Sequence, residues 1–163
     1  MKNKASEDKI AIIGLGYVGL PLAIEFGKIL NITGFDINKR RIKELSDRID
    51  LTKQVSKKDF AKAKKLNFTS KIKDIKDCNI YIVTVPTPKD LLQKPDLTMI
   101  KTATTMLSKI IKKNDIIVYE STVYPGVTED FCVPILEQNS GLRYINEENK
   151  EKNTIGFYCG YSP

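Results

Sequence analysis

Residues 9–27 read Lys9-Ile-Ala-Ile-Ile-Gly14-Leu-Gly16-Tyr-Val-Gly19-Leu-Pro-Leu-Ala-Ile-Glu-Phe-Gly27. An apolar run leads directly into three glycines spaced G-x-G-x-x-G, and a helical pattern follows. This order is typical of the strand-to-helix turn of dinucleotide-binding folds. The first glycine permits the tight turn, the second lets a pyrophosphate approach the backbone, and the third lets the helix pack closely on the strand. The stretch therefore predicts a phosphate site at a helix N-terminus, where free N–H groups and the helix dipole favour negative charge.

A carboxylate follows the glycines at the distance that this pattern requires. Residues 32–35 form a second apolar segment, and Asp36 comes directly after it. At the tip of a second strand, Asp36 can accept a hydrogen bond from a ribose 2′-OH, which favours NAD. The alternative is that Asp36 caps the helix that starts near Asn38. Basic residues at 39–41 oppose the NAD preference, because an Arg at such a position can pair the 2′-phosphate of NADP.

Strands and helices alternate along the chain. We expect strands over about 9–13, 32–36, 66–69, 79–85, 115–119 and 154–159. We expect helices from the glycine turn to about 30 and over about 38–48, 59–65, 97–111 and 127–138. Pro21 falls in the first turn of the first helix, Asp96 is placed to cap the fourth, and Pro134 must kink or divide the last. The polar stretch 146–153 is expected to be a surface loop. The alternation predicts an α/β fold, a Rossmann-type doubly wound parallel sheet in a single domain spanning 1–163.

Length and composition agree with one globular domain. The chain has 163 residues, of which 41% are hydrophobic and 29% are charged, so it can bury a core and is not disordered. It has no apolar run of about 18 residues, which excludes a membrane span. Residues 1–9 are charged and lack the apolar segment of a secretory signal, so we expect a cytoplasmic protein with no membrane partner.

The cysteine and histidine content narrows the chemistry. Cys78, Cys132 and Cys159 share no metal-binding spacing and are odd in number, so they are expected to be free thiols in a reducing cytoplasm. The sequence contains no histidine, which removes the commonest general base and metal ligand. We therefore predict no metal site.

Positive charge is concentrated in one segment. The net charge is +7, and residues 38–73 hold 13 Lys or Arg against 4 Asp or Glu. A basic block can indicate nucleic-acid binding, but only Phe60 and Phe68 supply aromatic rings within it. The lysines at 57, 58, 62, 64 and 65 also fit the solvated face of a helix. We therefore predict no nucleic-acid partner.

Two loops follow predicted strands at the sheet edge where ligands of open α/β folds bind. Residues 85–88 (Val-Pro-Thr-Pro) present the hydroxyl of Thr87 from a turn fixed by two prolines. Residues 120–126 (Glu-Ser-Thr-Val-Tyr-Pro-Gly) carry hydroxyls and a carboxylate. Each loop is either part of a site or a structural turn, and the pattern alone leaves both open.

Five motifs, taken in order, resemble the UDP-glucose/GDP-mannose dehydrogenase family. They are the glycine turn with Leu-Pro-Leu after it, Gly-Phe-Asp-Ile at 34–37, Val-Pro-Thr-Pro at 85–88, Glu-Ser-Thr-Val at 120–123 and Gly-Tyr-Ser-Pro at 160–163. Residues 119–128 and 132–136 are most similar to the bacterial UDP-N-acetylhexosamine (UDP-GlcNAc/UDP-GalNAc) 6-dehydrogenases of capsule and O-antigen synthesis. The resemblance spans about residues 9–163.

The resemblance implies an oxidoreductase. Members of this family oxidise the C6 hydroxyl of a nucleotide sugar to a carboxylate, using two NAD+ in succession. A cysteine captures the intermediate aldehyde as a thiohemiacetal, which becomes a thioester and is hydrolysed, so that one hard step is divided. The resemblance thus implies NAD as cofactor, a UDP-sugar as substrate and a homodimer for the complete enzyme.

The resemblance also assigns roles to residues of this sequence. The residues implied to line the pyrophosphate are Gly14, Gly16, Tyr17, Val18 and Gly19. Asp36 is implied to hold the adenosine ribose, and Arg41 to lie against the adenine-ribose end. Thr87 is implied to contact the nicotinamide half, and Thr122 to sit between nicotinamide and substrate, where it helps to orient a catalytic water.

One part of the family pattern is missing. The family's nucleophilic cysteine lies in a glycine-rich segment far downstream, and none of the three cysteines here matches it. The family normally has an active-site glutamate directly after the Ser-Pro that ends this sequence. We therefore expect the N-terminal cofactor domain of a longer enzyme, with the central helix and the UDP-sugar-binding domain outside this chain. The alternative is a free-standing NAD-binding sensor or regulatory module, which gives no reason for the loop at 120–123.

Overall fold

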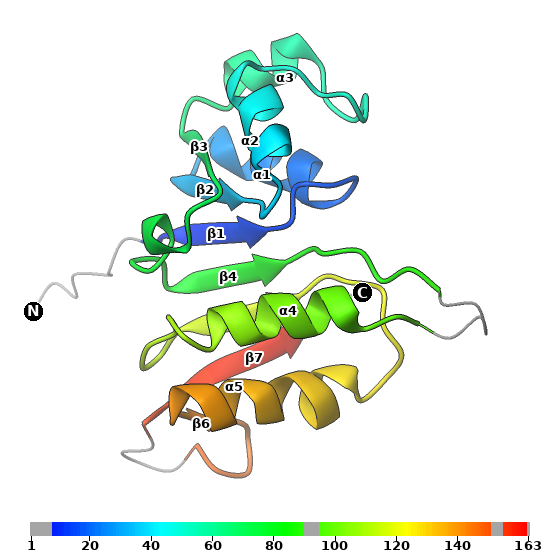
Figure 1. Cartoon of the computed structure of the whole chain (residues 1–163). Coiled ribbons are helices and arrows are strands. Elements are labelled where there is room, and N and C mark those ends of the chain that lie inside the picture. Colours follow the sequence, from blue (N-terminus) through cyan, green and yellow to red (C-terminus); the bar gives the residue numbers. More distant parts are fainter. Residues whose placement is uncertain (1–7, 90–94, 151–154, 163) are drawn as a thin grey trace, which may run out of the picture.

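The computed structural model describes residues 8–89, 95–150 and 155–162. In this part, seven strands form one sheet in the order β3-β2-β1-β4-β5-β7-β6, and every neighbouring pair runs parallel (Figure 1). The strands are β1 (Ile10–Ile13), β2 (Ile32–Phe35), β3 (Leu66–Thr69), β4 (Ile80–Val83), β5 (Ile116–Tyr119), β6 (Arg143–Tyr144) and β7 (Gly156–Tyr161). The chain builds outward from β1 to β3 and then returns to the other side of β1, which confirms the doubly wound fold.

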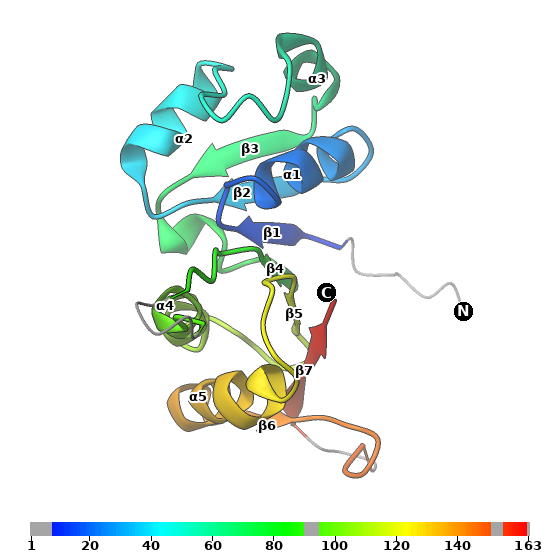
Figure 2. The ribbon, with the colours of Figure 1, turned by 90° about the vertical axis from the view of Figure 1, so that its right-hand side faces the viewer.

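Helices cover both faces of this sheet. They are α1 (Gly19–Gly27), α2 (Lys39–Ser46), α3 (Lys57–Lys62), α4 (Thr98–Leu107) and α5 (Val133–Ser140), with a short 3₁₀ helix at Ile72–Asp74 and a π-helical segment at Val127–Cys132. Figure 2 shows α4 and α5 together on one side of the sheet and α1 on the other. An all-parallel sheet needs cover of this kind because its connections cross over its faces.

Strand β1 divides its side chains between two hydrophobic cores. Ala11 and Ile13 pack in the core that contains residues of α4 and α5, whereas Ile10 and Ile12 pack in the core that contains residues of α1. Alternate residues of a strand point to opposite faces, so the continuous apolar run of β1 serves both cores. This burial fixes the carboxyl end of β1, and therefore the glycine turn, near the middle of the sheet.

Several predicted helix ends differ from the structure by a few residues. Helix α3 was expected over 59–65 but covers Lys57–Lys62, because Ser56 accepts the N–H of Asp59 while the Asp59 carboxylate accepts the N–H of Ser56. At α4 the N-cap residue is Leu97, and Asp96 instead accepts a hydrogen bond from the Thr98 N–H at 2.8 Å.

The prediction for Pro134 is confirmed. The helical stretch divides into the π-helical segment Val127–Cys132 and α5, and Pro134 lies in the first turn of α5, where its missing N–H costs nothing. Helix α5 continues beyond the predicted end and stops before Gly141, whose φ of 72° suits a residue without Cβ.

The remaining expectations fall partly outside the described residues. Of the predicted surface loop, residues 146–150 are exposed or half-buried, and 151–154 lie outside the described ranges. Thr154, the expected start of the last strand, is among the latter, and β7 begins at Gly156. Within the described part, no helix is long and apolar enough to span a lipid bilayer.

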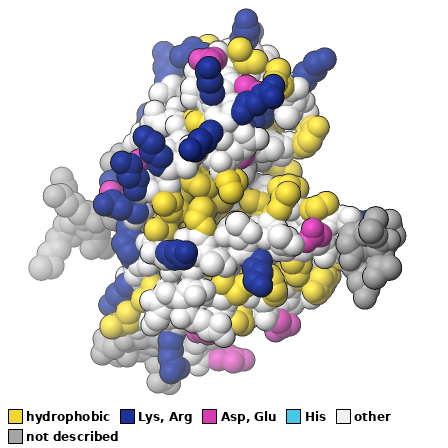
Figure 3. All heavy atoms as spheres, in the orientation of Figure 1, with side chains coloured by type: hydrophobic (Ala, Val, Ile, Leu, Met, Phe, Trp, Pro, Cys, Tyr) yellow, Lys and Arg dark blue, Asp and Glu magenta, His cyan; other side chains and the backbone are white. Residues whose placement is uncertain are grey.

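The basic segment lies on the surface around α2 and α3. The lysines at 57, 58, 62, 64 and 65 are all exposed, and Figure 3 shows Lys and Arg spread over the upper part of the molecule, where these helices lie. This exposure agrees with the interpretation that they form a solvated face.

Candidate dinucleotide-binding site

The three glycines of the turn differ in backbone conformation and in the space around them. Gly14 has φ +93°, a conformation that L side chains rarely adopt, and its N–H donates to the Phe35 carbonyl at 2.8 Å. A Cβ on Gly19 would lie 1.9 Å from the Gly14 carbonyl oxygen, so the start of α1 packs directly on the turn. A Cβ on Gly16 would meet nothing within 4 Å. The protein itself therefore gives no steric reason for Gly16 to lack a side chain.

Asp36 faces the glycine turn from the end of β2. Its Oδ2 accepts the N–H of Leu15 at 2.9 Å, and its Oδ1 accepts the N–H of Asn38 at 2.9 Å. Helix α2 is capped by Asn38, whose side chain accepts the N–H groups of Arg40 and Arg41, so the alternative that Asp36 caps this helix is wrong. Each carboxylate oxygen has a further lone pair, which leaves Asp36 able to accept a ribose hydroxyl.

A cavity of 560 Å³ opens where the turn, the β2–α2 junction and α4 meet. Gly14, Gly16, Asp36 and Arg41 line it on one side. Val85, Pro86 and four residues of α4 form the opposite wall, the latter being Met99, Thr102, Ala103 and Met106. Figure 3 shows hydrophobic side chains gathered across the middle of the molecule, between the helices above and α4 below. The cavity lies between β1 and β4, where the strand order reverses and where ligands of doubly wound sheets bind.

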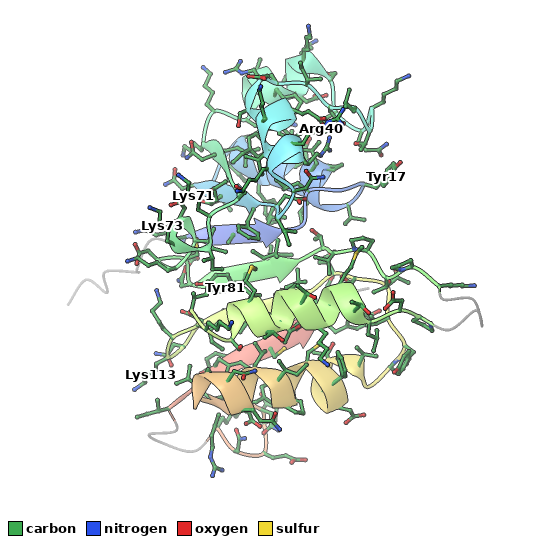
Figure 4. All side chains as sticks on the ribbon, viewed as in Figure 1. Tyr17, Arg40, Lys71, Lys73, Tyr81 and Lys113 are labelled. Atoms are coloured by element: carbon green, nitrogen blue, oxygen red, sulfur yellow. The ribbon has the colours of Figure 1, made fainter. Side chains whose placement is uncertain are left out.

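The other predicted residues of the turn lie outside the cavity wall. Tyr17 is 70% exposed, and Figure 4 shows its side chain projecting from the turn after β1. Val18 is also exposed, and Gly19 is buried at the start of α1. The structure thus separates residues that line the cavity from residues that shape or flank the turn.

Thr87 and Thr122 lie side by side, although 35 residues separate them in the sequence. The hydroxyl of Thr87 donates to the Thr122 carbonyl at 2.7 Å, and the hydroxyl of Ser121 donates to the Val85 carbonyl at 2.6 Å. These bonds join the loop after β4 to the loop after β5 at the carboxyl edge of the sheet. The hydroxyl of Thr87 therefore has a structural role, and Thr122 is exposed. Neither threonine lines the cavity.

Arg41 is the basic side chain of the cavity wall, and its hydrogen bonds explain its position. It is only 9% exposed, and its Nε donates to the Leu15 carbonyl at 3.0 Å. Its Nη2 donates to Oδ1 of Asp50 at 2.9 Å. Sequence reasoning missed Asp50, although the pair Asp50 and Thr52 has the spacing of an Asx turn, which is a recognisable signal.

The three cysteines are not suited to nucleophilic attack. All are free, and Cys78 and Cys132 are buried. Burial raises the pKa of each thiol above its ordinary value, which favours the thiol over the nucleophilic thiolate.

The parallel sheet, the glycine turn and the carboxylate at the tip of β2 define a Rossmann-type dinucleotide-binding domain. The chain belongs to the UDP-glucose/GDP-mannose dehydrogenase family, whose NAD binding domain matches residues 8–163. Its cofactor is accordingly NAD.

Several relatives share this domain. The chain is 52% identical over 155 residues to the UDP-N-acetyl-D-glucosamine 6-dehydrogenase of Pseudomonas aeruginosa, covering 95% of this chain and 35% of that protein. It is 50% identical over 157 residues to the enzyme of the same name from Salmonella typhi, covering 96% of this chain and 35% of that protein. Among solved structures, the UDP-D-ManNAc dehydrogenase of Pyrococcus horikoshii matches with a TM-score of 0.81 at 28% identity, over 95% of this chain and 36% of that one. The chain therefore spans about a third of the length of these relatives.

Proposed function

We propose that this domain holds NAD for an enzyme that oxidises the C6 hydroxyl of a UDP-N-acetylhexosamine to a carboxylate. The observation that carries the proposal is the identity of 52% and 50% to two proteins named UDP-N-acetyl-D-glucosamine 6-dehydrogenase. Because the relatives described above are enzymes, this proposal is preferred to a free-standing sensor. We further propose that the product serves capsule or O-antigen polysaccharide synthesis, and that the complete enzyme is a cytoplasmic homodimer.

The cavity residues fit the adenosine end of NAD. Gly14 and Gly16, flanked by Tyr17, Val18 and Gly19, offer the N-terminus of α1 to the pyrophosphate. Asp36 accepts a ribose hydroxyl through a free lone pair, and the apolar wall from α4 suits an adenine ring. Arg41 lies against the same end of the ligand.

The opposite end of the cofactor is proposed to lie near the joined loops after β4 and β5. NAD supplies the hydride acceptor of the reaction when it is bound. Thr87 fixes the Thr122 backbone by its hydrogen bond, and we propose that the exposed Thr122 orients substrate and water. The buried thiols supply no nucleophile, so we propose that the reactive cysteine belongs to a further domain of a longer polypeptide, as the one-third coverage of the relatives suggests.

Replacing Asp36 tests the ribose assignment. We expect Asp36→Ala to weaken NAD binding by about tenfold, because a hydrogen bond to a charged group contributes about 1.5–3 kcal/mol. The preference for NAD over NADP should narrow as well, since the carboxylate no longer repels a 2′-phosphate. Calorimetric titration of the 163-residue chain with both cofactors measures this, and tighter binding of NADP than NAD by the unmutated chain would contradict the assignment.

Turnover assays test whether this domain binds NAD without catalysing the reaction alone. The 163-residue chain should bind NAD but form no NADH with UDP-glucose, UDP-N-acetylglucosamine or UDP-N-acetylgalactosamine, because the nucleophile and the groups that stabilise a developing oxyanion lie elsewhere. A longer polypeptide that carries this domain should form NADH with a UDP-N-acetylhexosamine, as followed by absorbance. If the 163-residue chain formed NADH and mutating one of its cysteines abolished this activity, the proposal that the nucleophile lies in another domain would be wrong. If a longer protein were inactive on all three sugars, the proposed substrate class would be wrong.

A further inference from the structure

Arg41 is held by groups on three sides. Its Nε donates to the Leu15 carbonyl at 3.0 Å, and its Nη2 donates to Asp50 at 2.9 Å and to the Thr52 hydroxyl at 3.3 Å. Its Nη1 lies 3.9 Å from a carboxylate oxygen of Glu44. A guanidinium has five N–H groups in a rigid fork, so contacts on this scale fix both its position and its direction.

Asp50 is the strongest of these restraints, because it is itself immobilised. Its side chain is fully buried, and it accepts the N–H groups of Thr52, Gln54 and Val55 as well as the Thr52 hydroxyl at 2.6 Å. Burial opposes ionisation of Asp50, but the hydrogen bonds from Thr52, Val55, Arg41 and Gln54 outweigh it and lower its pKa to about 2. The carboxylate is therefore charged at every physiological pH, and it neutralises the guanidinium beside it.

The position of this pair relates to cofactor choice. Arg41 and Asp36 line the same cavity, and both bond to the backbone of Leu15 in the glycine turn. An Arg near the acidic residue at the tip of the second strand is the kind of residue that accommodates the 2′-phosphate of NADP. Here that guanidinium is already paired, whereas the neighbouring Arg40 is exposed and pairs with Glu44 at 3.1 Å on the surface.

We propose that Asp50 is a specificity-determining residue that favours NAD over NADP by occupying the Nη2 group of Arg41 and neutralising its charge, which weakens its attraction for a 2′-phosphate. Asp50 acts through Arg41 and does not itself line the cavity, so it is a positioning residue. In this proposal, discrimination against NADP has two sources in this chain, repulsion by Asp36 and neutralisation of Arg41 by Asp50. This inference rests on the proposed cofactor site.

The test compares the affinities of Asp50→Asn for NAD and NADP by calorimetry. We expect the ratio of NAD to NADP affinity to fall by about fivefold or more, mainly through tighter NADP binding, because Arg–phosphate pairs are among the stronger charge-assisted hydrogen bonds. Adding Arg41→Gln to Asp50→Asn should remove the gain in NADP affinity. A purely structural role of Asp50 predicts equal weakening of both cofactors and an unchanged ratio, which would overturn the proposal.

Two further variants complete the test. Asp47→Asn removes the same charge from an exposed position at the end of α2 and should leave the ratio unchanged. If Asp50→Asn does not fold, Thr52→Val tests the same proposal. It removes a hydroxyl that is bonded to both Arg41 and Asp50, while the backbone hydrogen bonds to Asp50 remain. We expect the ratio to fall by about twofold for Thr52→Val, and no change would overturn the proposal. Absence of NAD binding by the unmutated chain would instead refute the proposed cofactor site.

Discussion

Gly16→Val should abolish NAD binding and leave the fold intact. A Cβ at Gly16 meets no protein atom within 4 Å, and its φ lies outside the left-handed region, so we expect the free protein to accept a side chain there. The same side chain occupies the path proposed for the pyrophosphate at the N-terminus of α1. We expect the affinity for NAD to fall by about 100-fold or more, which corresponds to about 2.7 kcal/mol of binding free energy. Calorimetry measures this affinity. The melting temperature of the variant should stay within about 2 °C of that of the unmutated chain.

Gly16→Ala provides the graded control for this experiment. A single methyl group reaches less far than a branched side chain, so it should weaken NAD binding by less than valine does. Normal affinity of Gly16→Val for NAD would show that the pyrophosphate does not cross this residue, and the site would have to be placed elsewhere in the cavity.

Unlike Gly16→Val, Gly19→Ala should strongly reduce the stability of the fold. Its methyl group would lie 1.9 Å from the Gly14 carbonyl oxygen and 2.3 Å from the hydroxyl oxygen of Thr84, which itself donates to that carbonyl at 2.7 Å. Relief requires α1 to move away from the turn, because backbone rather than a flexible side chain stands in the way. We expect a loss of about 3 kcal/mol, near the upper end for overpacked sites, seen as a fall in melting temperature of about 10 °C.

Gly160→Ala is the matched control for the stability measurement. Gly160 lies in β7, and a Cβ there meets nothing within 4 Å, so its melting temperature should change little. If Gly19→Ala melted at the temperature of the unmutated chain, the close contact between α1 and the turn would not exist in solution.

The fold could be predicted from the sequence because the signals for it, apolar runs and the glycine turn, are local and the apolar runs recur along the chain. The apolar runs of β1, β2, β4 and β5 indicate buried strands, and Gly14 directly after β1 and Asp36 directly after β2 mark the carboxyl ends of the first two. The spacing from the glycines to Asp36 likewise predicted a carboxylate beside the turn, and the structure has its oxygen 2.9 Å from the Leu15 nitrogen. These features depend on residues close together in the sequence.

What the sequence did not reveal depends on contacts between distant residues. Asp50 lies 35 residues after Leu15, and only the folded chain shows that Arg41 joins the two. Strand β6 has two residues, too few for a hydrophobic period, and exists because Arg143 and Tyr144 lie beside β7. The bond from Thr87 to the Thr122 carbonyl similarly needs β4 and β5 to be neighbours.

The double use of Asp36 has an evolutionary consequence. One oxygen of its carboxylate accepts the Leu15 N–H in the glycine turn and the other accepts the N–H of Asn38, the N-cap residue of α2, so the group proposed to recognise the ribose also maintains the shape of the turn. Replacing Asp36 by a small neutral residue would make room for a 2′-phosphate, but it would also remove the hydrogen-bond acceptor of the Leu15 N–H. Drift from NAD to NADP through Asp36 is therefore expected to need two coordinated replacements, one that admits the 2′-phosphate and one that restores the lost acceptor.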